Sequence, residues 1–218
     1  MELFGHPFSL YSQKAILALY ESEIAFELRK LDEGSEAAAT WASIWPIEHF
    51  PVLVDGDRVI PEASAIIEYI QAKLPGDVRL IPSAAMEAVE VRLMDRIFDN
   101  YVATPAMRIV FDHGRPEGNH DEMGVEAWKA LLDKAYRWLD ERLSGRAWAA
   151  GDAFGMADCA AAPALLFAHW TYAIPAELRA LHGFRRRLIE RASYARLLDE
   201  SRKFRRFFPL GAPEADLD

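Results

Sequence analysis

The sequence has only one cysteine among its 218 residues, Cys159, so no disulfide can form within the chain. This scarcity is typical of proteins from the reducing cytoplasm, where we expect the protein to act. No apolar run reaches the roughly 18 residues of a membrane-spanning helix. The start of the chain, MELFGHPFSLYSQKA, lacks the basic residues and apolar core of a signal peptide. We therefore expect neither a membrane span nor a secretion signal.

Positive charge is also scarce: the chain has 25 Lys and Arg residues and 34 Asp and Glu residues, which gives a formal net charge of -9. Nucleic-acid binding requires a basic face, so nucleic acid is not an expected partner. The six histidines are scattered and lack His-x-x-x-His spacing, so we expect no metal site. The triplet Arg185-Arg186-Arg187 stands out, but such runs are most often solvated helix faces.

The first third of the chain has the pattern of an α/β domain. Residues 2–5 and 26–29 read as short strands, and apolar spacing between them predicts a helix over about 12–22. Two strands joined through a helix form a βαβ unit, so these strands should be parallel. Residues 35–47 look irregular or weakly helical.

The stretch from His49 to Ile70, HFPVLVDGDRVIPEASAIIEYI, predicts a hairpin followed by a helix. Asp55-Gly56 is a tight-turn signal, and Glu62 opens the apolar-periodic helix. Cis peptides occur at X-Pro bonds, and a cis Phe50-Pro51 bond would leave the Phe50 N–H and C=O free to pair with an extended ligand. The helix N-terminus suits a carboxylate. This stretch therefore predicts a site for a small peptide-like anion.

After Ser83 the pattern becomes helical throughout. A breaker cluster at 74–77 predicts the boundary, giving a first domain at 1–76, a linker at 77–84 and an all-α domain at 85–218. The helix over 156–171 is almost wholly apolar, so we expect it and Cys159 in the core. The expected helices of this domain are 84–111 (kinked at Pro105), 121–143, 156–171, 176–192 and 194–203.

Three segments together resemble the cytosolic glutathione transferases: FGHPFSLYSQKAILAL at 4–19, HFPVLVDGDRVIPEASAI at 49–66 and AGDAFGMADCAAAPAL at 150–165. The resemblance is to the serine-type, bacterial-like members and covers nearly the whole chain. It implies a thioredoxin-like α/β N-terminal domain, an all-α helical C-terminal domain, a homodimer, and glutathione as co-substrate.

Members of this family lower the pKa of the glutathione thiol, which is otherwise about 8.5. A hydroxyl that donates to the sulfur and a nearby helix N-terminus both favour the thiolate. By resemblance, Ser9 is that hydroxyl, with Ser12 and Tyr11 as close alternatives. The structural alternative is that Ser9 serves only the loop and Ser12 only caps the helix.

The resemblance also assigns the residues that bind glutathione. Phe50, before Pro51, should pair through its backbone with the cysteinyl part, and His49 takes the place of the residue that binds the glycyl carboxylate. Glu62 and Ala63 should hold the γ-glutamyl end.

Three positions depart from the family pattern. Ala63 replaces a serine and loses a hydrogen bond worth about 1–3 kcal/mol to a charged group. Glu48 replaces a glycine and adds negative charge near an anionic ligand. In the segment that caps the buried helix, Gly155 replaces Ser or Thr, although Asp158 can still accept from the cap N–H.

Two functional hypotheses follow. The first is a glutathione transferase that activates the thiolate for attack on a small apolar electrophile. The second is a non-catalytic glutathione-transferase-like binding or regulatory protein that acts through protein contacts; Ala63, Glu48 and a surface patch of Trp41 and Trp45 favour it. The electrophile should lie between the domains, where the candidates for an apolar wall are Tyr11, Phe98, Tyr101, Val102, Phe207 and Phe208.

Overall fold

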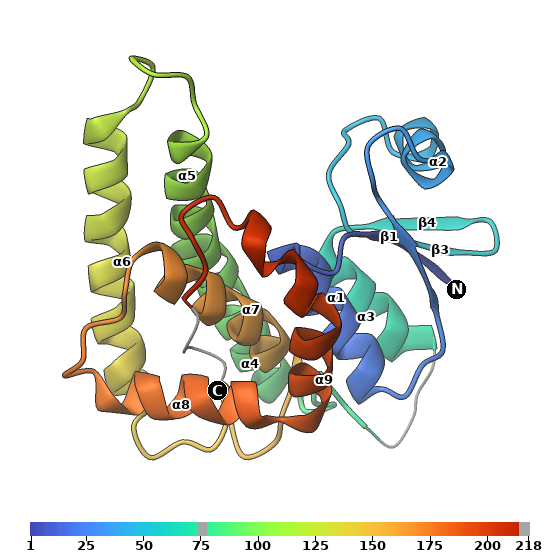
Figure 1. Cartoon of the computed structure of the whole chain (residues 1–218). Coiled ribbons are helices and arrows are strands. Elements are labelled where there is room, and N and C mark those ends of the chain that lie inside the picture. The colour runs from blue at the N-terminus through green and yellow to red at the C-terminus, as the bar shows by residue number, and fades with distance from the viewer. Residues whose placement is uncertain (74–77, 214–218) are drawn as a thin grey trace.

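The computed structural model describes residues 1–73 and 78–213. A small α/β unit lies beside a larger helical unit, and α9 (Ala192–Ser201) packs against α1 (Leu10–Glu21) of the small unit (Figure 1). The other elements of the small unit are β1 (Glu2–Gly5), β2 (Glu27–Lys30), α2 (Glu36–Ile44), β3 (Val52–Asp55), β4 (Arg58–Pro61) and α3 (Ala63–Lys73). The predicted boundary at 74–77 lies outside the described residues.

The sheet has the strand order β2-β1-β3-β4, with β1 parallel to β2 and the other pairs antiparallel. Helices α1 and α3 lie on one side of it and α2 on the other (Figure 1). The parallel βαβ unit and the hairpin are thus confirmed. Asp55 pairs with Arg58 across the turn, and Gly56 has the positive φ of +64° that glycine tolerates best.

Three predictions in this unit need correction. Helix α1 begins at Leu10 rather than near Ser12, because Ser9 is its N-cap and accepts a hydrogen bond from the Ser12 N–H at 3.4 Å. Trp41 and Trp45 are half-buried rather than exposed, and the Nε1 atom of each ring is buried. Residues 36–44 form a regular helix, which Ser35 caps by accepting from the Ala38 N–H.

The helical unit contains one long helix that changes its winding. Proline has no N–H to donate, so Pro105 interrupts the α-helical ladder. The turn before it widens into a π-helix, in which the Thr104 N–H reaches the Asp99 carbonyl five residues back. The predicted single helix is therefore three segments: α4 (Ala85–Ile97), η1 (Phe98–Ala103) and α5 (Thr104–His113).

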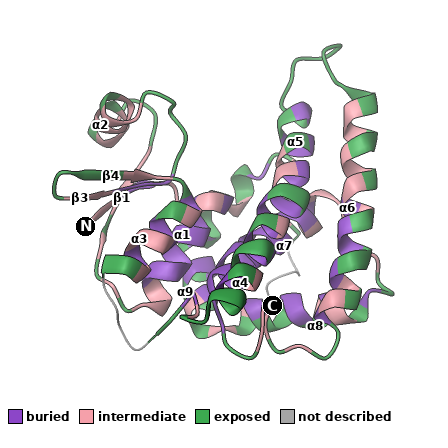
Figure 2. Ribbon diagram, turned by 180° about the vertical axis from the view of Figure 1, so that it is seen from behind, coloured by how far each residue is buried: buried purple, intermediate pink, exposed green. Residues whose placement is uncertain are grey.

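Helix α7 (Met156–Thr171) is buried along nearly its whole length, as predicted, and Cys159 with it (Figure 2). It packs against α1, α4 and η1. Around it lie α6 (Glu122–Leu143), α8 (Arg179–Glu190), α9 and η2 (Arg202–Phe207). None of the described helices is long and apolar enough to cross a membrane.

The N-terminus of α7 is capped by one of its own side chains and by a carbonyl of the segment before α4. Asp158 accepts from the Gly155 N–H at 2.9 Å, so the predicted half of the capping box is present. The Met156 N–H donates to the Leu80 carbonyl at 2.8 Å. A Cβ on Gly155 would lie 2.8 Å from that carbonyl oxygen, which explains why glycine occupies this position.

Candidate functional site

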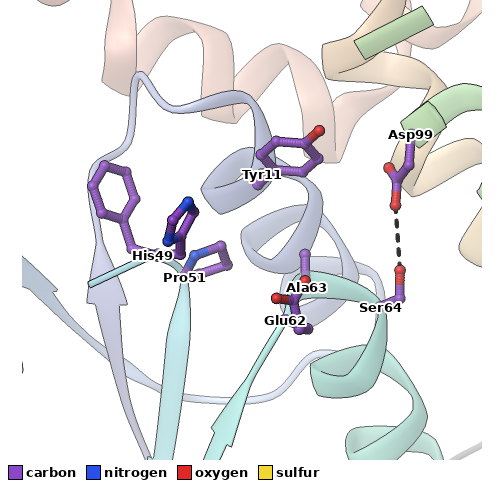
Figure 3. Close-up of a pocket in the computed structure, with 8 residues that line it drawn as sticks. Tyr11, His49, Pro51, Glu62, Ala63, Ser64 and Asp99 are labelled. Atoms are coloured by element: carbon purple, nitrogen blue, oxygen red, sulfur yellow. Dashed lines mark hydrogen bonds between the residues drawn. The ribbon is translucent and has the colours of Figure 1, made fainter. Parts of the chain in front are cut away.

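A cavity of about 230 Å³ opens between the two units, at the start of α3. The five predicted ligand-binding residues and one alternative hydroxyl meet there, together with residues of the π-helix and α3 (Figure 3). The lining residues are Tyr11, His49, Phe50, Pro51, Glu62, Ala63, Ser64 and Asp99. All five of the predicted glutathione-binding positions are in this set.

The loop before β3 forms one wall of the cavity. The Phe50-Pro51 peptide bond is cis, and β3 begins at Val52, so the Phe50 backbone lies outside the strand. The Phe50 ring packs edge-on against Trp41, with their centroids 5.7 Å apart. His49 is exposed, and its Nδ1 lies 3.0 Å from the Ile47 carbonyl. This wall offers a free peptide backbone and an imidazole to a ligand.

The start of α3 forms the opposite wall. Glu62 has a φ of +71°, a left-handed conformation that strains a residue with a side chain. It turns the chain from β4 into α3, so that Ala63 is the first helical residue. The first N–H groups of a helix have no intrahelical partner and carry a partial positive charge, which suits a carboxylate.

Behind this wall lies a buried group of charged residues that spans both units. Lys14 of α1 is fully buried, and its Nζ lies 2.6 Å from Asp95 Oδ1 and 2.7 Å from Asp99 Oδ2. Ser64 accepts from Lys14 at 2.8 Å and donates to Asp95 at 3.0 Å. The half-exposed Arg96 closes the group with ion pairs to both aspartates. The Ser64 hydroxyl is thus engaged in this network and is not available to replace the hydroxyl that Ala63 lacks.

Asp99 links this buried group to the cavity. Its Oδ2 faces Lys14, Ser64 and Arg96, whereas its Oδ1 is buried and finds no hydrogen-bond partner among the described residues. Burial raises the pKa of the Asp99 carboxyl, and the neighbouring Lys14 opposes that rise. Since Asp99 also lines the cavity, its carboxylate places negative charge beside the wall that α3 forms.

The three candidate hydroxyls have different surroundings. Ser12 is fully buried and its Oγ accepts from the His6 N–H at 3.2 Å. Tyr11 lines the cavity, and its hydroxyl lies 3.4 Å from Thr104 Oγ1. Burial raises the pKa of Tyr11, so the phenol stays protonated at neutral pH. Ser9 is half-buried at the α1 N-terminus and does not line the cavity.

The predicted apolar wall is not assembled at this cavity. Tyr11 is its single member among the residues that line it. Phe98, Val102 and Phe208 are buried in the core, where Phe98 stacks on Phe184. Tyr101 and Phe207 are exposed elsewhere.

Comparison with known proteins places this geometry in a family. Residues 3–77 match the glutathione S-transferase N-terminal domain, and residues 122–188 match the C-terminal domain. Glutathione S-transferase GstB of Escherichia coli K12 is 31% identical over 168 residues, which cover 74% of this chain and 79% of GstB. The chain belongs to the glutathione S-transferase family.

Other members of the family resemble the chain over more of its length. Glutathione S-transferase U25 of Arabidopsis thaliana is 24% identical over 209 residues, 92% of this chain and 90% of U25. The crystal structure of a glutathione S-transferase from Methylobacillus flagellatus KT with GSH bound superposes with a TM-score of 0.82 at 23% identity, over 90% of this chain and 98% of that one. The thioredoxin-like and all-α architecture is thereby confirmed.

Sequence reasoning did not find the buried charged group. Its signal was present: Asp95 and Asp99 are four residues apart on the buried face of a helix, and Lys14 interrupts the apolar face of α1. Charges at such positions are rarely buried unless they are paired. Their pairing with one another depends on how the two units dock, which no local pattern reveals.

Proposed function

We propose that this member of the family is a glutathione transferase, in which the cavity binds glutathione and the enzyme activates its thiol for attack on a small apolar electrophile. The observation that carries the proposal is the meeting of the cis Phe50-Pro51 peptide and the α3 N-terminus at one cavity. The first offers hydrogen bonds to the cysteinyl backbone. The second offers N–H groups to the γ-glutamyl carboxylate.

Within this proposal the γ-glutamyl end lies between α3 and the π-helix. The Ala63 N–H receives the carboxylate, with Glu62 beside it, and the Asp99 carboxylate at the edge of the cavity attracts the ammonium group. His49 is then left for the glycyl carboxylate.

We further propose that Ser9 is the hydroxyl that donates to the thiolate. Its oxygen already accepts the Ser12 N–H, so its own hydrogen remains free for a ligand. The rival is Tyr11. However, the Thr104 hydroxyl donates to the Asp99 carbonyl at 2.8 Å, so in the long contact between Tyr11 and Thr104 the phenol must be the donor. The Tyr11 proton is therefore partly engaged, and its side chain shapes the cavity.

The test is to compare Ser9→Ala with Tyr11→Phe. We expect Ser9→Ala to lower kcat/KM for a generic aryl halide about 100-fold and to raise the pKa of bound glutathione, because one charge-assisted hydrogen bond is lost. Tyr11→Phe should stay within a few-fold of the wild type. The reverse ranking would transfer the role to Tyr11.

Glutathione binding distinguishes this function from a non-catalytic role, for which the comparisons offer no positive support. Calorimetric titration with glutathione should show one site per chain. Absence of binding at millimolar glutathione would end the proposal of catalysis.

We also propose that the enzyme is a cytoplasmic homodimer. Helix α4 exposes Met86, Val89 and Leu93, which lie three and four residues apart and so form one apolar stripe. Tyr101 continues the stripe along the π-helix, and it is 49% exposed. An apolar stripe of this length on a soluble protein is typical of a subunit interface. The single cysteine favours the cytoplasm.

A further inference from the structure

Arginines gather around a hollow of about 550 Å³ between α8 and the loop after α6, remote from the glutathione cavity. Arg146, Arg179 and Arg187 line this hollow, and Gly145 and Gly183 give it room. An adjoining hollow of about 390 Å³ shares Arg179 and Gly183 and adds Arg186. Four guanidinium groups thus border one continuous depression in a chain of net charge -9.

The helical repeat explains the arrangement. Counted from Arg179, the next members of the depression on α8 follow after four, seven and eight residues, at Gly183, Arg186 and Arg187. This spacing places them on one face of the helix. A Cβ at Gly183 would meet no atom within 4 Å, so the floor between the arginines is open. The sequence prediction that Arg185-Arg186-Arg187 is a solvated face is wrong for Arg185, which is only 8% exposed and belongs to the interior.

Among the residues that the structure describes, Arg146 is the only one of these four arginines with a carboxylate partner. Arg187 donates to the Ala147 carbonyl at 2.7 Å, a contact that fixes its direction and leaves its charge uncompensated. Arg146 lies 3.5 Å from Glu90, which is bound more closely by Arg142. Arg179 and Arg186 have no side-chain partner within 1–73 and 78–213.

Two acidic side chains near the depression are engaged in other contacts. Asp140 accepts from the Leu181 N–H at 2.9 Å, and Glu90 forms an ion pair with Arg142. No carboxylate of the described part of the chain lines either hollow. The guanidinium groups of Arg179 and Arg186, which have no carboxylate partner in the described part of the chain, match phosphate oxygens in charge and in geometry.

We propose that this depression binds a small ligand with two or more linked phosphoryl groups, such as a polyphosphate or the phosphate tail of a nucleotide. A single phosphate would leave most of the four charges unused. A nucleic acid would need a basic track beyond these residues, and the rest of the chain is acidic. A membrane surface would need exposed apolar residues beside the arginines, and the lining residues other than arginine and histidine are small apart from Leu143, which is buried.

The experiment is calorimetric titration of the full chain with sodium tripolyphosphate and, separately, with ATP, at low and high salt. We expect one site per chain, weakened by salt. The variant Arg179→Ala/Arg186→Ala should bind tripolyphosphate at least about tenfold more weakly than the wild type does. The control Arg58→Ala/Arg137→Ala removes the same charge from exposed positions elsewhere and should bind as the wild type does.

A second variant, Gly183→Glu, places a carboxylate on the open floor without a steric clash and should abolish binding while the thermal midpoint is kept. No saturable binding by the wild type at millimolar tripolyphosphate would overturn the proposal. So would equal losses in the two double variants, which would indicate long-range attraction alone. Tighter binding to a DNA duplex or to phosphatidylglycerol vesicles than to tripolyphosphate would overturn the assignment to a small ligand. Glutathione titration of the same variants should be unchanged, whatever the outcome for the proposed transferase activity.

Discussion

Replacing Lys14 with methionine tests the buried charged group behind the cavity. Lys14 Nζ contacts Asp95 and Asp99 at 2.6 and 2.7 Å, and these three residues are all buried. Methionine fills a similar volume but leaves two carboxylates with the half-exposed Arg96 as their remaining cation. Removing one partner of a buried ion pair costs about 3–5 kcal/mol, because the other charge is left uncompensated.

For a chain of this length, that loss lowers the thermal midpoint by roughly 6–20 °C, at about 2–4 °C per kcal/mol. Circular dichroism melting and urea unfolding measure it directly. The matched control is Lys134→Met, at an exposed position on α6, where we expect less than about 0.5 kcal/mol.

A second substitution checks the cause. Adding Asp95→Asn to Lys14→Met removes one of the two uncompensated charges, so the double variant should be more stable than Lys14→Met alone. A loss of under 1 kcal/mol for Lys14→Met, or a double variant less stable than the single, would refute the reasoning. Glutathione affinity should fall along with stability, because Asp99 also lines the cavity.

Three further outcomes are expected. Gly155→Ser, which restores the residue type of the family pattern, should destabilise the protein by about 1–3 kcal/mol, because the added Cβ meets the Leu80 carbonyl. The control is Gly183→Ala, where an added Cβ meets no atom within 4 Å, and a Gly155→Ser variant more stable than the wild type would contradict the prediction. Burial raises the pKa of Asp158 to about 7, whereas the pKa of an aspartate in an unfolded chain is about 3.9. Between pH 4 and 7 the folded state therefore holds a proton on Asp158 that the unfolded state has lost. Over this range the stability of the wild type relative to Asp158→Asn should fall by up to ~4 kcal/mol. Urea unfolding at several pH values measures that difference, and a flat profile would speak against it. Leu93→Glu, in the α4 stripe, should yield monomers in analytical ultracentrifugation while Arg137→Glu does not, and a monomeric wild type would exclude the interface.

Features governed by local chemistry were predictable from the sequence. The hairpin follows from Asp55-Gly56, because few residues other than glycine accept a φ of +64°. The half capping box of Asp158 follows from a carboxylate three residues after the cap position. The cis bond at Pro51 was expected because cis peptides occur at X-Pro bonds and because the family resemblance supported it. These features carried the family resemblance, and with it the fold.

Features set by tertiary contacts were not predictable in the same way. The start of α1 moved to Leu10 because two serines compete for the cap, and spacing alone does not rank them. The proline effect was predicted as a kink at Pro105, but its form as a π-helix depends on how Thr104 and Asp99 pack beneath Tyr11. At the site, the five predicted binding positions came from the resemblance, whereas the place of Asp99 beside the cavity depends on the docking of the two units.

The bond from Met156 to the Leu80 carbonyl has a consequence for dissection of the protein into its domains. Leu80 precedes α4, so a fragment that starts at Ala85 lacks the carbonyl that accepts from the first N–H of α7. Helix α7 is the central helix of the core of that fragment. The Gln71 side chain of α3 in turn accepts from the Leu80 N–H at 2.8 Å and fixes that carbonyl. The helical domain therefore depends on hydrogen bonds from Leu80 and Gln71, which precede it in the chain. We expect chimeras that exchange this domain between relatives to fold best when the crossover lies upstream of Gln71.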